Sequence, residues 1–130
     1  MQALLVPVRS DWYALELAWV REVVIDPAPA PLPTTPATII GLFNLRGQVL
    51  PVLDTAALLG LPPLGDAPAG VVVDTPQGPV CLAISGPGET VALPIAAGPS
   101  QLQAAVSWHE VGDRVATLVS RERLLEGITS

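Results

Sequence analysis

The chain has 130 residues, the length of one ordinary domain, and half of them are hydrophobic while only 14% are charged. This composition excludes an intrinsically disordered chain, which requires low hydrophobicity and high charge. The net charge is −6 and the six basic residues are all arginines, too few to form the basic patch of a nucleic-acid-binding protein. The 11 glycines and 15 prolines divide the chain into short pieces, so long helices are not expected.

Three features bear on the compartment in which the protein acts. The long uncharged run at residues 27–45 is interrupted by prolines and cannot form a membrane-spanning helix of about 20 apolar residues. The first ten residues lack a basic segment before an apolar stretch, so no signal peptide is predicted. Cys81 is the single cysteine and cannot form an internal disulfide, in agreement with a reducing compartment. We therefore expect a cytoplasmic protein with no direct membrane insertion.

Strand patterns dominate the first half of the chain. Apolar or alternating stretches predict strands at residues 4–6, 12–17, 20–25, 38–45 and 48–53. Prolines between residues 26 and 36 predict an extended, ordered crossover on the surface, because each proline fixes φ and moves the residue before it out of the helical region. Asn44 and Gly47 are expected to shape the bend between the last two strands, because asparagine and glycine tolerate positive φ at low cost.

Short helices are predicted after Asp54 and after Ser120. Asp54 has the character of an N-cap for a helix over residues 55–59 that Gly60 ends. In the second half, strands are predicted at residues 71–73, 80–84, 90–94, 103–108 and 114–119. Ser120 then begins a helix over residues 121–126 that Gly127 is expected to end.

The two halves of the chain form a weak internal repeat. At an offset of 67 residues, Leu4 falls on Val71 and Glu22 falls on Glu89, and residues 52–59 fall on residues 118–125 at an offset of 66. The repeat predicts two related β units with a boundary near residues 62–68.

The side chains that could carry out catalysis are few. His109 is the only histidine and is expected in the bend before Gly112, so no histidine-rich metal site is predicted. Cys81 lies in an apolar strand, where cysteine behaves as a small hydrophobic residue. The segment 86–88, Gly-Pro-Gly, lacks the following glycine and helix of a phosphate-binding loop and predicts a turn. No cofactor and no metal are expected.

Two aspartates give a remote enzymatic alternative. Asp54 and Asp74 each follow two apolar residues and precede a threonine, and two such aspartates in a β-barrel could share a proton as in an aspartic protease. The glycine that this family has after Asp-Thr is replaced by Ala56 and Pro76. A helix cap at Asp54 and a turn after Asp74 explain both residues more simply.

Residues 32–54 carry a more specific pattern. Pro33 and Pro36 precede an apolar pair and Gly41, and the run Asn44-Leu45-Arg46-Gly47 is followed by an apolar stretch that contains Pro51 and ends at Asp54. This pattern resembles the signature of CheW-like domains. Upstream, residues 13–15 and 20–23 are also similar to that family, and the resemblance is strong from about residue 13 to residue 61.

The resemblance implies a fold and a function. The fold is mainly β, with two small five-stranded SH3-like β-barrel subdomains and short helices in a single domain over residues 1–130. Its halves are expected at roughly 1–65 and 66–130, intertwined at the termini. The implied function is that of a non-catalytic signalling adaptor that couples chemoreceptors to a CheA-type histidine kinase through barrel-to-barrel contacts. The alternative is a scaffold in another chemosensory or motility system, such as pilus-based movement.

The resemblance also implies a partner-binding surface, and six residues match its positions: Val20, Glu22, Gly41, Asn44, Arg46 and Gly47. Gly41 is expected to allow a close approach of strands. Arg46 is the only charged residue between Asp26 and Asp54, and a guanidinium in apolar surroundings must be paired with an internal acid or with a partner. We predict that Arg46 and Glu22 form an ion pair, which is weak if exposed and costly to break if buried.

Overall fold

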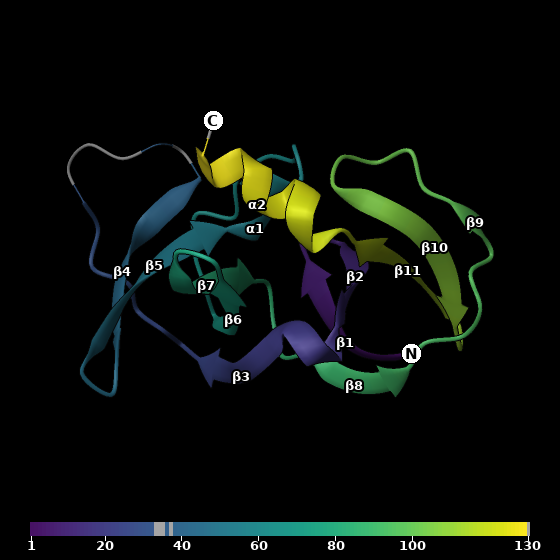
Figure 1. Cartoon of the computed structure of the whole chain (residues 1–130), viewed down its shortest axis with the longest axis horizontal. Helices are drawn as coiled ribbons and strands as arrows, with labels where there is room; N and C mark the ends of the chain where they lie inside the picture. The colour runs from purple at the N-terminus through teal and green to yellow at the C-terminus, as the bar shows by residue number, and fades with distance from the viewer. Residues whose placement is uncertain (33–35, 37, 130) are drawn as a thin grey trace.

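The computed structural model of the chain describes residues 1–32, 36 and 38–129, with side chains of the last helix described as far as Glu126. It is mainly β, as predicted, with two short α-helices and one 3₁₀ turn (Figure 1). The strands are β1 (Gln2–Val8), β2 (Asp11–Glu16), β3 (Val20–Ile25), β4 (Ile39–Leu45), β5 (Gln48–Asp54), β6 (Ala69–Thr75), β7 (Gly78–Ile84), β8 (Glu89–Ala92), β9 (Gly98–Pro99), β10 (Ala105–Val111) and β11 (Arg114–Val119). The helical segments are η1 (Leu17–Trp19), α1 (Thr55–Leu58) and α2 (Arg121–Thr129).

The strands form two sheets that lie side by side in Figure 1. Sheet A has the order β8-β1-β2-β11-β10-β9, and sheet B has the order β3-β6-β7-β5-β4. Sheet A has six strands rather than the predicted five because of the two-residue β9, and hydrogen bonds between the described strands close neither sheet into a complete barrel.

Each sheet combines strands from both halves of the sequence. Sheet A takes the first hairpin, β1 and β2, together with β8 to β11, whereas sheet B takes β3 to β7. The sheets therefore do not coincide with residues 1–65 and 66–130. The two halves exchange strands across the segment between α1 and β6, so that neither half contains a whole sheet.

The internal repeat is confirmed by the register of the strands. Leu4 lies opposite Leu15 in sheet A, and 67 residues further along Val71 lies opposite Leu82 in sheet B. The parallel pair of Leu118 and Ala14 likewise matches Val52 and Cys81. The β10–β11 hairpin has a register shift between Ala105 and Ser107. The β4–β5 hairpin has the matching shift between Ile39 and Gly41.

The main hydrophobic core lies between the two sheets. Apolar side chains from β1 and β2 pack there against side chains from β5, β6 and β7, and both α-helices contribute to the same cluster. Burial of apolar side chains away from water is the dominant favourable contribution to the free energy of folding. The interface of the two sheets therefore contributes most of the apolar stabilisation. The fully buried members include Leu15, Leu53, Leu82, Ile84 and Leu124.

The crossover after β3 is ordered where the structure describes it, but it is not uniformly extended. Asp26 and Ala28, which both precede prolines, have φ of +49° and +44°. The backbone N–H of Ala30 donates to the carbonyl oxygen of Leu42 at 2.8 Å, and the N–H of Leu42 donates back to Ala30 at 2.9 Å. This exchange adds a bridge to the edge of β4. Residues 33–35 of the predicted crossover, and residue 37 after it, lie outside the described part of the chain.

Three local predictions are wrong. His109 lies within β10 and not in a bend, because the hairpin turn begins only after Val111. The strand predicted at residues 103–108 begins at Ala105 and continues to Val111. Helix α2 continues past Gly127 to Thr129. Over the described residues, no helix is long and apolar enough to cross a membrane.

Candidate functional site

The β4–β5 hairpin presents the Asn-Leu-Arg-Gly motif at its tip. Leu45 pairs with Gln48, which leaves Arg46 and Gly47 as a two-residue loop with φ of +49° and +89°. Positive φ at both loop residues is the geometry of a type I′ hairpin turn. The Oδ1 atom of Asn44 accepts a hydrogen bond from the N–H of Gly47 at 2.8 Å. Asn44 and Gly47 thus shape the bend, and Arg46 adopts the left-handed conformation at a cost of about 1–2 kcal/mol for a residue with a side chain.

Arg46 and Glu22 form the predicted ion pair, and its geometry is bidentate. The Nη1 atom of Arg46 donates to Oε1 of Glu22 at 3.2 Å, and Nη2 donates to Oε2. Paired donors on a carboxylate form the stronger class of charged hydrogen bond. The hydrogen bond from Arg46 lowers the pKa of the Glu22 carboxyl, and Glu22 raises the pKa of Arg46. The apolar surroundings expected for Arg46 are wrong, because its side chain is 71% exposed.

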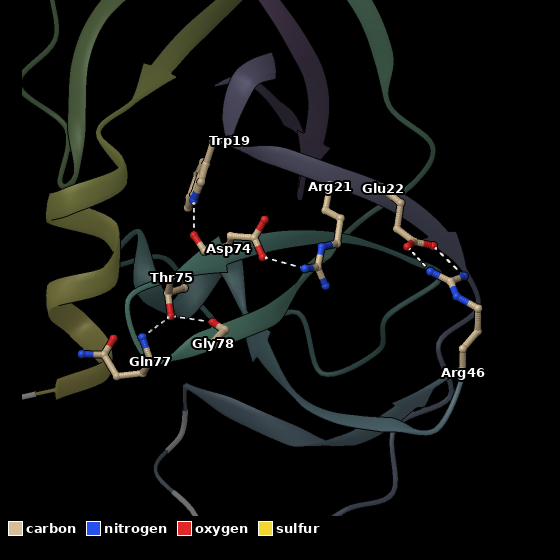
Figure 2. A network of polar contacts seen from close by, with 8 residues as sticks. All are labelled: Trp19, Arg21, Glu22, Arg46, Asp74, Thr75, Gln77 and Gly78. Atoms are coloured by element: carbon tan, nitrogen blue, oxygen red, sulfur yellow. Dashed lines mark hydrogen bonds and ion pairs between the residues drawn. The ribbon is translucent and has the colours of Figure 1, made fainter.

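The Glu22–Arg46 pair connects the two outer strands of sheet B (Figure 2). Glu22 lies on β3 at one edge of the sheet, and Arg46 follows β4 at the other edge. Arg21, the residue before Glu22, turns instead toward Asp74 on β6, with 3.3 Å between Nη2 and Oδ1. Trp19 donates from its indole N–H to the carbonyl oxygen of Asp74 at 3.0 Å. The two edge strands of sheet B, β3 and β4, are therefore linked by the side chains of Glu22 and Arg46 and not by backbone hydrogen bonds.

Gly41 and Val20 have structural positions beside this pair. A Cβ atom at Gly41 would overlap the carbonyl oxygen of Ala30, so glycine here allows the crossover to lie against β4, as the sequence predicted. Val20 begins β3, lies opposite Val73 and packs against the main core.

Three exposed aliphatic side chains lie on strands of the same sheet, and sequence reasoning missed them. Val23 and Ile25 on β3 are 38% and 71% exposed, and Val49 on β5 is 59% exposed. We call Glu22, Val23, Ile25, Arg46 and Val49 the Arg46 surface. The signal was present in the strands: Val49 alternates with the buried Leu50, and Val23 and Ile25 alternate with the partly buried Val24.

A second ion pair occupies the equivalent place in sheet A. The Nη2 atom of Arg114 lies 2.9 Å from Oε2 of Glu89 on β8, and its guanidinium stacks over the ring of Trp12 at 4.6 Å from the centroid. The repeat offset that carries Glu22 onto Glu89 could have identified the acidic partner. It could not have identified Arg114, which lies beyond the turn of its hairpin rather than within it.

The structure separates the two aspartates of the enzymatic alternative, which is therefore wrong. The carboxylate of Asp54 is buried and accepts the N–H groups of Ala57 at 3.1 Å and Leu64 at 2.8 Å. Asp54 is aligned across β7 with Gly70, four residues from Asp74 along β6. At about 3.3 Å per residue, the two aspartates are offset by roughly 13 Å along the strand direction, and β7 lies between their strands. Asp74 is exposed and paired with Arg21.

The remaining polar or nucleophilic groups also have structural positions. Both ring nitrogens of His109 are engaged, Nε2 with the hydroxyl of Ser107 at 2.8 Å and Nδ1 with the carbonyl oxygen of Pro94 at 2.7 Å. Burial raises the pKa of the Cys81 thiol to about 12. Among the described residues, no three His, Cys, Asp or Glu side chains are grouped as metal ligands.

Comparison with known proteins agrees with this geometry. The family model described as CheW-like domain matches residues 2–129. The probable chemotaxis protein CheW of Rhizobium etli is 34% identical over 61 residues, which cover 47% of this chain and 39% of the relative. The chemotaxis protein CheW of Rhizobium meliloti is 39% identical over 49 residues, which cover 38% of this chain and 32% of the relative. The matched segments thus span well under half the length of these two relatives.

A solved structure shows the same fold. The crystal structure of the scaffolding protein TtCheW from Thermoanaerobacter tengcongensis superposes with a TM-score of 0.81 at 21% identity, covering 96% of this chain and 92% of that one. At this identity the likeness shows that the two proteins share the fold of two side-by-side sheets. The chain belongs to the CheW-like domain family.

Proposed function

We propose that this protein is a chemotaxis adaptor that couples chemoreceptors to a CheA-type histidine kinase in the cytoplasm. The kinase's regulatory domain would bind against sheet B. The observation that supports the proposal is the Arg46 surface, which combines a guanidinium held in a bidentate ion pair with three exposed aliphatic side chains on strands of the same sheet. Arginine beside apolar area is the composition of an interface core.

The proposed contact surface contains the six family-matched residues in different roles. Glu22 and Arg46 offer charged groups at the surface. Asn44 and Gly47 hold the loop that carries Arg46, while Gly41 lets the crossover lie against β4 and Val20 packs β3 against the main core. The loop that carries Arg46 is already ordered before a partner binds. Binding therefore costs less conformational entropy than binding to a flexible loop would.

The test is the affinity of the Arg46→Ala variant for the regulatory domain of a CheA-type kinase and for a chemoreceptor tip from the same cell, measured by calorimetry. We expect Arg46→Ala to weaken binding to at least one of them by more than about fivefold, equivalent to about 1 kcal/mol. The matched control is Arg9→Ala: Arg9 is also an exposed arginine with positive φ in a hairpin turn, but it donates to the carbonyl oxygens of Pro62 and Pro63. Its affinity should stay at the wild-type value.

The same variants separate a binding role from a structural one. If Arg46→Ala lowers only the melting temperature and the folded variant binds as well as the wild type, the Arg46 surface is not the contact. If the wild type binds no CheA-type kinase of the cell, the coupling function is wrong. Binding to the kinase of another chemosensory or motility system alone would assign the domain to that system instead.

A further inference from the structure

The crossover that leaves β3 has a strained backbone at two residues that each precede a proline. Asp26 has φ of +49° and Ala28 has φ of +44°, in the left-handed region that residues with a side chain rarely adopt. Pro27 and Pro29 follow them, and a proline moves the residue before it toward extended backbone. We call residues 26–31 the strap. Strain of this kind persists only where surrounding contacts hold the backbone in place.

The strap is held at its two ends. The N–H of Asp26 donates to the carbonyl oxygen of Pro68 at 2.9 Å, and Ala30 exchanges its two backbone hydrogen bonds with Leu42 on β4. The exchange with Leu42 is an isolated bridge and not part of a longer ladder. This single pair of hydrogen bonds therefore keeps the strained backbone on the edge of sheet B (Figure 1).

The open edge of β4 continues past the bridge toward the hairpin loop. Backbone groups alternate in direction along a strand, and Leu42 directs its N–H and C=O groups away from β5. Asn44 therefore directs its own N–H and C=O groups to the same side. The bridge at Ala30 does not extend to Asn44, which is exposed. The backbone of Asn44 is available for pairing with another extended segment.

A pocket of about 440 Å³ lies between the strap and this part of the hairpin. Its walls include Pro27 and Ala28 on the strap and the apolar side chains of Phe43 and Val49 on the hairpin. Val49 is also part of the Arg46 surface, so the pocket and that surface are continuous. An extended segment beside β4 would direct alternate side chains toward one face of the sheet, and the pocket can accept one of them.

We propose that the strap leaves β4 when an extended segment of the kinase's regulatory domain pairs with the backbone of Leu42 and Asn44. This inference rests on the proposed function, because it states how the same surface receives its partner. The incoming segment replaces Ala30 as the hydrogen-bond partner of Leu42, so no backbone group of β4 loses its partner. It also adds hydrogen bonds at Asn44 and releases the strain at Asp26 and Ala28.

The proposal makes the opening of the strap and the affinity for the kinase change together. When a partner binds only the open form, its apparent affinity is proportional to the open fraction. Amide exchange of Ala30 and Leu42 in the free protein measures the same fraction, because both N–H groups are bound in the bridge. A substitution in the strap that speeds this exchange by some factor should therefore tighten kinase binding by the same factor.

Two substitutions of Ala28 change the strain in opposite directions. Ala28→Val places a β-branched side chain at positive φ, and it should speed the exchange of Ala30 and Leu42 and tighten kinase binding, each by about fivefold. Ala28→Gly removes the strain, and it should slow the exchange and weaken binding by about threefold, after allowance for the greater freedom of glycine in the open strap.

Ala104→Gly is the matched control for the glycine variant. Ala104 also has positive φ, at +60°, but it precedes β10 in sheet A. Its replacement should leave both the exchange at Ala30 and Leu42 and the affinity for the kinase at the wild-type values.

Exchange is followed by NMR, and affinity is measured by calorimetry with the regulatory domain of a CheA-type kinase from the same cell. In the complex, Ala30 should lose protection, Leu42 should keep it and Asn44 should gain it. If Ala30 stays protected, or if affinity does not follow the exchange rates of the Ala28 variants, the partner binds with the strap in place and the proposal is overturned, although the coupling function stands. If the wild type binds no such kinase, the coupling function fails and the proposed role of the strap fails with it.

Discussion

Replacing Asp54 by alanine tests a buried side chain that binds two separate segments of the chain. Its carboxylate caps α1 through the N–H of Ala57 and holds the return segment through the N–H groups of Leu64 at 2.8 Å and Gly65 at 3.4 Å. Loss of the helix cap costs about 0.5–2 kcal/mol. A buried N–H left without an acceptor, here that of Leu64, costs about 1–3 kcal/mol.

The expected loss of unfolding free energy for Asp54→Ala is therefore about 3 kcal/mol, a large share of the roughly 5–15 kcal/mol that stabilises a domain. Urea titration followed by circular dichroism measures it, and the melting temperature should fall by about 10 °C. Asp74→Ala is the matched control, because its carboxylate is exposed in a surface ion pair with Arg21 that is worth at most about 1 kcal/mol. A loss below 1 kcal/mol for Asp54→Ala would refute the capping argument.

Three further predictions follow from individual contacts. Gly41→Ala should displace the crossover from β4, because its Cβ overlaps the Ala30 carbonyl, and should cost about 1–3 kcal/mol together with faster amide exchange at Ala30; unchanged exchange would contradict this. Because Arg46 lowers the pKa of Glu22, this carboxylate stabilises the folded state above its unfolded pKa of about 4.3, and the contribution is lost as the pH falls through the lower folded value. The wild type should therefore lose more stability between about pH 5 and pH 3 than Glu22→Gln, and parallel pH profiles would exclude the contribution. With its pKa raised to about 12, Cys81 should react with a thiol reagent at pH 8 only at the rate of unfolding, and immediate reaction of the native protein would contradict its burial.

Much of the fold could be predicted from the sequence because local chemistry determines it. Asp54 and Ser120 cap helices where their short polar side chains precede helix formers. The offset of 67 residues predicted related β units, and the strand registers confirm it residue by residue. The Glu22–Arg46 pair was predicted because charges are scarce in that part of the chain.

The predictions that failed depend on tertiary context. The repeat offset is the same whether each hairpin pairs within its own half or with the other half, so the expectation that the halves are intertwined at the termini came from the family resemblance and not from the offset. His109 has no local signal that distinguishes a strand from a bend, and its position depends on contacts with Ser107 and with the distant Pro94. The exposure of Arg46 was misjudged because its sequence neighbours are apolar, although they lie in the strands and Arg46 lies in the turn.

The strand exchange gives the chain the connectivity of a swapped homodimer whose two subunits have been fused. Each sheet uses the first hairpin of one repeat and the remaining strands of the other, joined through residues 61–68 between α1 and β6. Cutting this linker would leave two fragments held together by both sheets and by the shared core, so the pieces should reassociate rather than behave as independent modules.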